Sequence, residues 1–151
     1  DMFENIILTK NKKLYSSVFT GIQCLVFMKE NYNQDVSFEK FFSSIKYLDI
    51  EYSKTLWIHL TPLLRQPFFA TEEAQRYIAL SINKCIDIYE NLADQGERYY
   101  LDGLYNCVEA LHQYYKSVKT TRTGETDELK QCVEKARKIK NYEIANIWSY
   151  E

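Results

Sequence analysis

Residues 71–118 read TEEAQRYIALSINKCIDIYENLADQGERYYLDGLYNCVEALHQYYKSV, and this stretch decides the fold. Thr71 is a favourable N-cap residue, and the acidic pair Glu72-Glu73 suits the positive end of a helix dipole. Apolar side chains then recur at steps of three and four, which is the spacing of one helix face. They are Ala74, Ile78, Ile82, Cys85, Tyr89 and Leu92. Gly96 predicts the end of this helix.

The segment 97–118 repeats the same spacing and predicts a second helix. Its apolar stripe consists of Tyr100, Leu104, Cys107, Leu111, Tyr114 and Val118. Only the short Gln95-Gly96 connection separates the two helices, so we expect them to form an antiparallel hairpin.

The chain before the hairpin also shows helical spacing. Segment 11–30 carries the stripe Leu14, Val18, Ile22, Leu25 and Val26. Ser37 is an N-cap candidate for a long helix with Phe38, Phe41, Phe42, Ile45 and Leu48 on one face. Ser53 restarts or continues that helix. Pro62 and Pro67 predict a break or kink within residues 61–69.

The chain after the hairpin begins with an exposed loop, because residues 119–125 include no apolar side chain. Thr126 is expected to cap a last helix, with Leu129, Val133, Ala136 and Ile139 facing inward. The apolar segment 144–148 is expected to dock onto the body. No segment alternates with period two. We therefore predict an all-α single domain over residues 1–151, a bundle or short stack of five to seven helices with the hairpin at its centre.

Composition agrees with a globular chain. Of 151 residues, 46% are apolar and 26% are charged. The longest strongly apolar run, residues 24–28, is far shorter than the ~20 residues that span a bilayer. Residues 1–10 lack the pattern of a signal peptide, so we expect a cytoplasmic protein with no membrane contact. Asp1 stands before Met2, and we interpret it as a cloning remnant.

The four cysteines are scattered through the chain. Cys24, Cys85, Cys107 and Cys132 form no C-x-x-C pair, which argues against a zinc site. Each lies on or beside an apolar stripe, so we expect four reduced, buried thiols.

Charge is unevenly distributed. Residues 116–140 carry eight Lys/Arg and four Asp/Glu, whereas the rest of the chain carries eleven Lys/Arg and seventeen Asp/Glu. An acidic body favours a cationic partner. The basic residues of the last helix are interspersed with Glu128 and Glu134, which is typical of a solvated helix face. We therefore expect no direct nucleic-acid binding.

Motifs for catalysis are scarce, and we expect no metal or other cofactor. Glu109 and His112 form one E-x-x-H, but a carboxylate di-iron site needs two such motifs. His59 has Leu56 where the second Glu would stand. Small helical RNases of the HEPN type carry an Arg four to six residues before a His, whereas Asn106 stands before His112. Because His112 lies near the edge of its stripe, a position on the surface or flanking the stripe is expected.

Tyrosine is unusually frequent, with 13 residues against two histidines. Several project away from the apolar stripes of the hairpin, among carboxylates. Tyr anchors with acidic neighbours suit a basic protein partner. The predicted partner-binding residues are Tyr77, Asp87, Asp94, Tyr99, Asp102, Tyr105 and Glu109. Packing of these tyrosines against a neighbouring helix is the alternative interpretation.

In size, acidity, helical pattern and lack of a catalytic motif, the chain resembles bacterial immunity proteins, including partners of contact-dependent growth-inhibition toxins. The stretch from Leu101 to Asn106, continuing to His112, is similar to helical immunity families, although no site is carried over from it. The resemblance implies a cytosolic inhibitor of one cognate toxin, with a basic nuclease as the expected partner. Two alternatives remain: a helical scaffold acting as a homodimer through the same Tyr face, and an RNase with a site near Glu109 and His112.

Overall fold

The computed structural model describes residues 12–32, 38–47, 50–96 and 98–150. These residues form seven α-helices and three short 3-10 helices, with no strand among them. In chain order they are α2 (Lys12–Tyr32), α3 (Glu39–Ser44), η1 (Ile45–Tyr47), α4 (Ile50–Leu64), η2 (Pro67–Ala70), α5 (Glu72–Ala93), α6 (Arg98–Lys119), α7 (Asp127–Arg137), α8 (Tyr142–Ala145) and η3 (Asn146–Tyr150). The prediction of an all-α fold with five to seven helices is confirmed.

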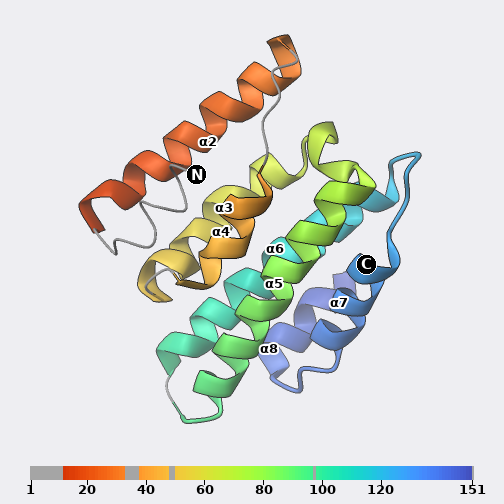
Figure 1. Ribbon diagram of the computed structural model, residues 1–151. Helices are drawn as coiled ribbons and strands as arrows, with labels where there is room; N and C mark the ends of the chain where they lie inside the picture. Colours follow the sequence, from red (N-terminus) through yellow and green to blue (C-terminus); the bar gives the residue numbers. More distant parts are fainter. Residues whose placement is uncertain (1–11, 33–37, 48–49, 97, 151) are drawn as a thin grey trace.

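The hairpin of α5 and α6 lies between α3 and α4 on one side and α7 and α8 on the other (Figure 1). Helix α5 contacts α3 and α7, and α6 contacts α4, α7, α8 and η3. Helix α2 packs on α4. Helix α7 therefore packs against both arms of the hairpin, and the faces of α5 and α6 that meet each other form the middle of the core.

The predicted caps of α5 and α7 are present. The Thr71 hydroxyl accepts a hydrogen bond from the backbone N–H of Ala74 at 3.3 Å, and Thr126 accepts one from Leu129 at 3.2 Å. Gly96 has a φ of +87°, in the left-handed region that a glycine adopts without strain. The sequence signals therefore placed the start of α5, the start of α7 and the turn of the hairpin correctly.

The segment before α5 differs from the prediction of one long helix. Helix α3 is followed directly by the tighter turn η1, and Ser37 and Leu48 lie outside the described residues. Ser53 is inside α4 rather than at its start. Pro62 is also inside α4, which ends two residues later at Leu64. Because proline has no backbone N–H, the carbonyl of Ile58 lacks its helical donor, and this occurs on an exposed side of the helix.

The C-terminal segment docks as expected. Ile144 and Ile147 are buried in the main hydrophobic cluster, and Trp148 packs against its edge. Within the described ranges, none of the helices is long and apolar enough to cross a membrane.

Helices α5 and α6 approach closely at Gly103. A Cβ atom built there would lie 3.0 Å from Cε1 and 3.1 Å from Cδ1 of Tyr89. The Tyr89 ring is buried, and its hydroxyl donates a hydrogen bond to the Ser53 hydroxyl. The ring is therefore held from both ends and has little room to move.

We expect Gly103→Ala to destabilise the protein. The substitution gains about 1 kcal/mol of helix propensity, but crowding a packed core costs about 1–3 kcal/mol. Because the Tyr89 ring is fixed, we expect a net loss of about 1 kcal/mol in urea denaturation. Tyr89→Leu in the same background should remove most of the penalty, and equal penalties with Tyr and Leu at position 89 would contradict this explanation.

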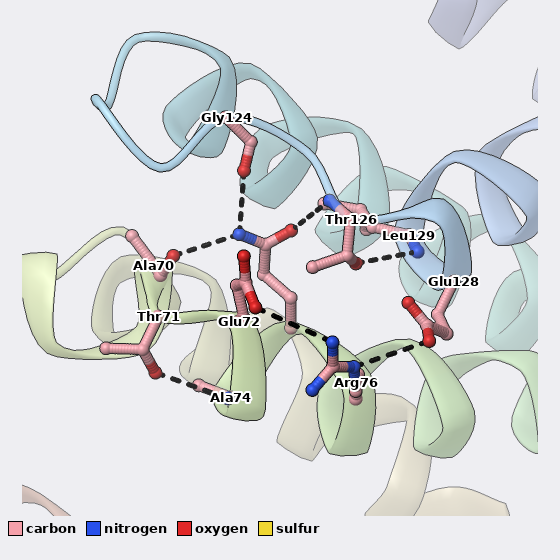
Figure 2. Close-up of polar contacts among 10 residues, drawn as sticks. Ala70, Thr71, Glu72, Ala74, Arg76, Gly124, Thr126, Glu128 and Leu129 are labelled. Atoms are coloured by element: carbon pink, nitrogen blue, oxygen red, sulfur yellow. Dashed lines mark hydrogen bonds and ion pairs between the residues drawn. The ribbon is translucent and has the colours of Figure 1, made fainter.

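One buried amide joins three parts of the chain. The Gln75 side chain donates to the carbonyl oxygens of Ala70, at 2.9 Å, and Gly124, at 2.8 Å. It also accepts a hydrogen bond of 2.7 Å from the backbone N–H of Thr126 (Figure 2). The side chain is fully buried. It therefore fixes the loop between α6 and α7 against the start of α5.

The cysteines divide into two classes. Cys85, Cys107 and Cys132 are buried, whereas Cys24 is exposed on α2, so the prediction of four buried thiols is wrong at Cys24. Cys24 lies one helical turn before Met28, which is also exposed on α2. The Cys107 thiol donates to the Ile82 carbonyl across the α5–α6 contact, with the sulfur 3.8 Å from the oxygen.

We expect one fast thiol out of four in the folded protein. At low protein concentration, the thiol reagent DTNB should modify Cys24 rapidly and the other three cysteines only when urea unfolds the chain. Cys24→Ser should remove the fast phase without changing the slow one. A second fast thiol in folded Cys24→Ser would show that the core opens more readily than its burial indicates.

The buried thiols also predict loss of stability at alkaline pH. Burial raises the pKa of Cys132 from 9.0 to about 12 and raises the pKa of Cys107 well above its ordinary value. Above about pH 9 the unfolded chain therefore releases protons that the folded chain retains, and stability falls as pH rises towards the folded pKa. Urea midpoints should fall from about pH 8 to about pH 10.5. Cys132→Ala should make this decline shallower, and an identical decline would contradict it.

Candidate functional site

The predicted partner-binding residues lie on two opposite sides of the hairpin. Ile82 and Tyr89 of α5 face α6, as their contacts with Cys107 and Gly103 show. At about 100° per residue, Asp87 projects about 140–160° from both of these α5 side chains and therefore away from α6. Tyr105 is two residues from both Gly103 and Cys107, so it projects away from α5. The predicted partner-binding residues therefore do not form the single face expected from the sequence, because those of α5 and those of α6 point in opposite directions.

On the α5 side, Tyr77 packs between helices. Its ring stacks on Phe42 of α3, with centroids 5.4 Å apart and an interplanar angle of 27°. Burial raises the pKa of the Tyr77 phenol above its ordinary value, and the carboxylates of Glu73 and Glu39 raise it further. The alternative interpretation, packing against a neighbouring helix, therefore describes Tyr77.

Asp87 is exposed on α5 but forms an ion pair with Lys135 of α7. A second bridge joins the same two helices, from Arg76 to Glu128 at 3.4 Å. The basic helix α7 thus neutralises part of the acidic body. Asp87 would have to leave Lys135 before pairing with a partner.

Asp94 lies at the C-terminal end of α5, beside a hollow of about 530 Å³. The floor of this hollow is apolar, with Leu101, Leu104 and Ile139, and its rim includes Glu90 and Lys140. Both acidic and basic side chains line it, so the hollow has no single sign of charge.

On the α6 side, Asp102, Tyr105 and Glu109 share one strip of helix, which we call the α6 face. Tyr105 is 37% exposed, Asp102 is exposed and Glu109 is half-buried. Glu109 accepts a hydrogen bond of 3.1 Å from Gln113, which orients its carboxylate. Asp102 forms no ion pair with any residue that the structure describes. The side chain of Tyr99 lies outside the described residues.

Helix α4 adds a residue to the α6 face that the sequence did not reveal. Ile58 is 54% exposed, and it lines a hollow of about 360 Å³ together with Glu109 and Asn106. Arg65 lines the same hollow from the end of α4. The helical spacing of α4 shows only that Ile58 lies outside the apolar stripe of that helix. Only the packing of α4 on α6 places it beside Glu109.

The two residues of the E-x-x-H motif on α6 differ in burial, because Glu109 is half-buried and His112 is buried. His112 is only 3% exposed, and its ring lies edge-on to Trp148 at 5.1 Å, so the expected surface position is wrong. The docked C-terminal segment, which helical spacing on α6 alone does not reveal, covers this side chain. Across the described part of the chain, no three His, Cys, Asp or Glu side chains form a group able to hold a metal ion.

Comparison of the chain with protein-family models, curated proteins and solved structures finds no match.

Proposed function

We propose that this protein is a non-enzymatic inhibitor that binds a basic protein partner through the α6 face. The observation that carries the proposal is the position of Tyr105, an exposed aromatic ring with a carboxylate one turn away on either side, Asp102 and Glu109. Aromatic side chains dominate the energy of protein interfaces, and carboxylates direct the approach of a cationic partner.

Ile58 supports the proposal by extending the apolar part of the surface onto a second helix. A face built on two packed helices is rigid, so little conformational entropy is lost when it binds. Asp102 has no ion-pair partner among the described residues, and its charge is therefore available to a lysine or arginine of the partner. Arg65 at the rim limits how much positive charge the hollow itself can accept.

The partner class that we propose is a basic toxin domain, with a nuclease as the favoured example, and the protein would act as its immunity protein in the cytoplasm. An acidic surface that binds such a domain blocks the groove that would otherwise bind nucleic acid. The alternative in which this chain is itself an RNase needs a reactive His112. The burial of the His112 ring against Trp148 favours an inhibitor over an RNase.

The test is capture of the partner from the native host, with three baits: the wild-type chain, the double variant Asp102→Ala/Tyr105→Ala, and Tyr142→Ala. Tyr142 is 83% exposed on α8 and is not among the residues of the α6 face, so it is the Tyr control at a different exposed position. We expect the wild type and Tyr142→Ala to retain the same basic protein and the double variant to lose it.

The captured protein is then expressed in a sensitive host with and without this chain. Growth arrest that the wild type relieves and the double variant does not would support the proposed function. A captured protein that is acidic, or that does not harm the host, would overturn the assignment as a toxin inhibitor.

A further inference from the structure

The hollow beside the α6 face lies between two helices that run in the same direction. The Ser117 hydroxyl of α6 donates a hydrogen bond to the carbonyl of Arg65, just after the end of α4, with the two oxygens 3.4 Å apart. Earlier in both helices, Ile58 of α4 lines the hollow of about 360 Å³ together with Asn106 and Glu109 of α6. The hollow therefore has an apolar end at Ile58 and a basic end at Arg65, with the Glu109 carboxylate on its α6 side.

Arg65 and Glu109 line the same hollow but are not paired with each other. Within the residues that the structure describes, no ion pair joins Arg65 to Glu109 or to any other carboxylate. Gln113 donates a hydrogen bond of 3.1 Å to Glu109, which holds this carboxylate on α6. The Arg65 side chain is exposed. The hollow thus presents one cation and one anion, and both charges are available to a bound protein.

A partner that covers the α6 face also covers Arg65, because Arg65 and Glu109 line the same hollow. A guanidinium that leaves water without gaining an acceptor is costly. A partner that offers only lysine and arginine would also place like charge against it, which is destabilising. A carboxylate opposite Arg65 is the favourable arrangement, because the two groups can form a pair of parallel hydrogen bonds.

We propose that this hollow is the specificity site of the α6 face: a carboxylate of the basic partner binds Arg65, beside a lysine or arginine that binds Glu109. Ile58 would pack against the methylene groups of that basic side chain. The carboxylates of the α6 face attract cationic proteins in general, whereas the hollow favours one that carries both charges side by side, so it discriminates among them. The site belongs to the α6 face, and its assignment therefore rests on the proposed function.

Reversing the charge of Arg65 distinguishes this site from general attraction between opposite charges. The probes are the basic protein captured by the wild-type chain and polylysine, a cation without acidic side chains, each measured by surface plasmon resonance. We expect Arg65→Glu to weaken binding of the captured protein by about tenfold or more, although the face becomes more acidic. Lys130→Glu, the matched reversal at an exposed position of α7, should change that affinity by about twofold or less. Both reversals should strengthen binding of polylysine.

Two milder variants test each half of the site. Arg65→Ala adds no new charge and should weaken the captured protein by a smaller factor than Arg65→Glu. Glu109→Gln keeps an acceptor for Gln113, removes the charge and should also weaken it. The urea midpoints should equal that of the wild type, because Arg65 is exposed and Glu109→Gln conserves the shape of the side chain.

The assignment is overturned if Arg65→Glu binds the captured protein as tightly as the wild type or more tightly, or if neither milder variant weakens binding. That result leaves the proposed function standing as long as Asp102→Ala/Tyr105→Ala still loses the same protein. If the wild-type chain captures no basic protein, the proposed function and the specificity site are both overturned.

Discussion

Replacing Gln75 by alanine is expected to lower the free energy of unfolding by about 3 kcal/mol or more. The substitution leaves the carbonyls of Ala70 and Gly124 and the N–H of Thr126 without the partner that now satisfies them. Each buried polar group that loses its hydrogen bond costs about 1–3 kcal/mol. Urea denaturation followed by circular dichroism measures the loss.

Gln75→Glu separates the hydrogen bonds from the size of the side chain. A carboxylate keeps the acceptor for Thr126 but places negative charge against the carbonyls of Ala70 and Gly124. Burial raises the folded pKa of such a glutamate, so its stability is greatest below the unfolded pKa of about 4.3 and is lost as pH rises. We therefore expect Gln75→Glu to approach the wild type in acid and to fall behind it at neutral pH.

Arg76→Ala is the adjacent control for both variants. Arg76 pairs with Glu72 at 3.6 Å and Glu128 at 3.4 Å, and all three side chains are at least half exposed. Exposed pairs of this kind contribute about 1 kcal/mol or less. If Arg76→Ala costs as much as Gln75→Ala, the stability of this region does not come from the buried amide.

Tyr105→Ala is expected to weaken binding of the captured basic partner by about 30-fold or more, the loss typical of an aromatic anchor at about 2 kcal/mol. Asp102→Ala should act differently, by lowering the association rate, with an effect that shrinks as salt is added. Surface plasmon resonance at two ionic strengths distinguishes the two effects.

The controls for this prediction are Tyr142→Ala, which should bind like the wild type, and the urea midpoint of each variant, which should not change. Both altered side chains are exposed, so the fold does not depend on them. Wild-type affinity in Tyr105→Ala would remove the α6 face from consideration as the binding surface.

Local signals in the sequence predicted much of the fold. The caps at Thr71 and Thr126, the stop at Gly96 and the apolar stripes of α5 and α6 each act over a few residues, and each is present. The break predicted within residues 61–69 is confirmed, because α4 ends at Leu64 and the 3-10 helix η2 begins at Pro67. Pro62 itself lies inside α4, where a proline near the end of a helix removes one hydrogen bond without ending the helix at once.

The candidate site was less predictable, because helical spacing shows where a side chain points but not what meets it there. Phe42 covers Tyr77 and Trp148 covers His112, and both covering residues come from distant elements. Asp87 meets Lys135 for the same reason. The buried Gln75 left one trace in the sequence, a polar residue directly beside the apolar stripe, but its three partners become evident only in the packed structure.

The hydrogen bonds between Gln75 and the α6–α7 loop also determine where residues can be inserted into this loop. Its amide bonds to Gly124 and to Thr126, two positions whose spacing is fixed by the size of one side chain. Extra residues inserted among residues 120–123 would lengthen an exposed loop at small entropic cost. An insertion or deletion between Gly124 and Thr126 would separate these two positions from the Gln75 amide and break at least one of its hydrogen bonds. Natural variation in the length of this loop is therefore expected before Gly124 and not between Gly124 and Thr126.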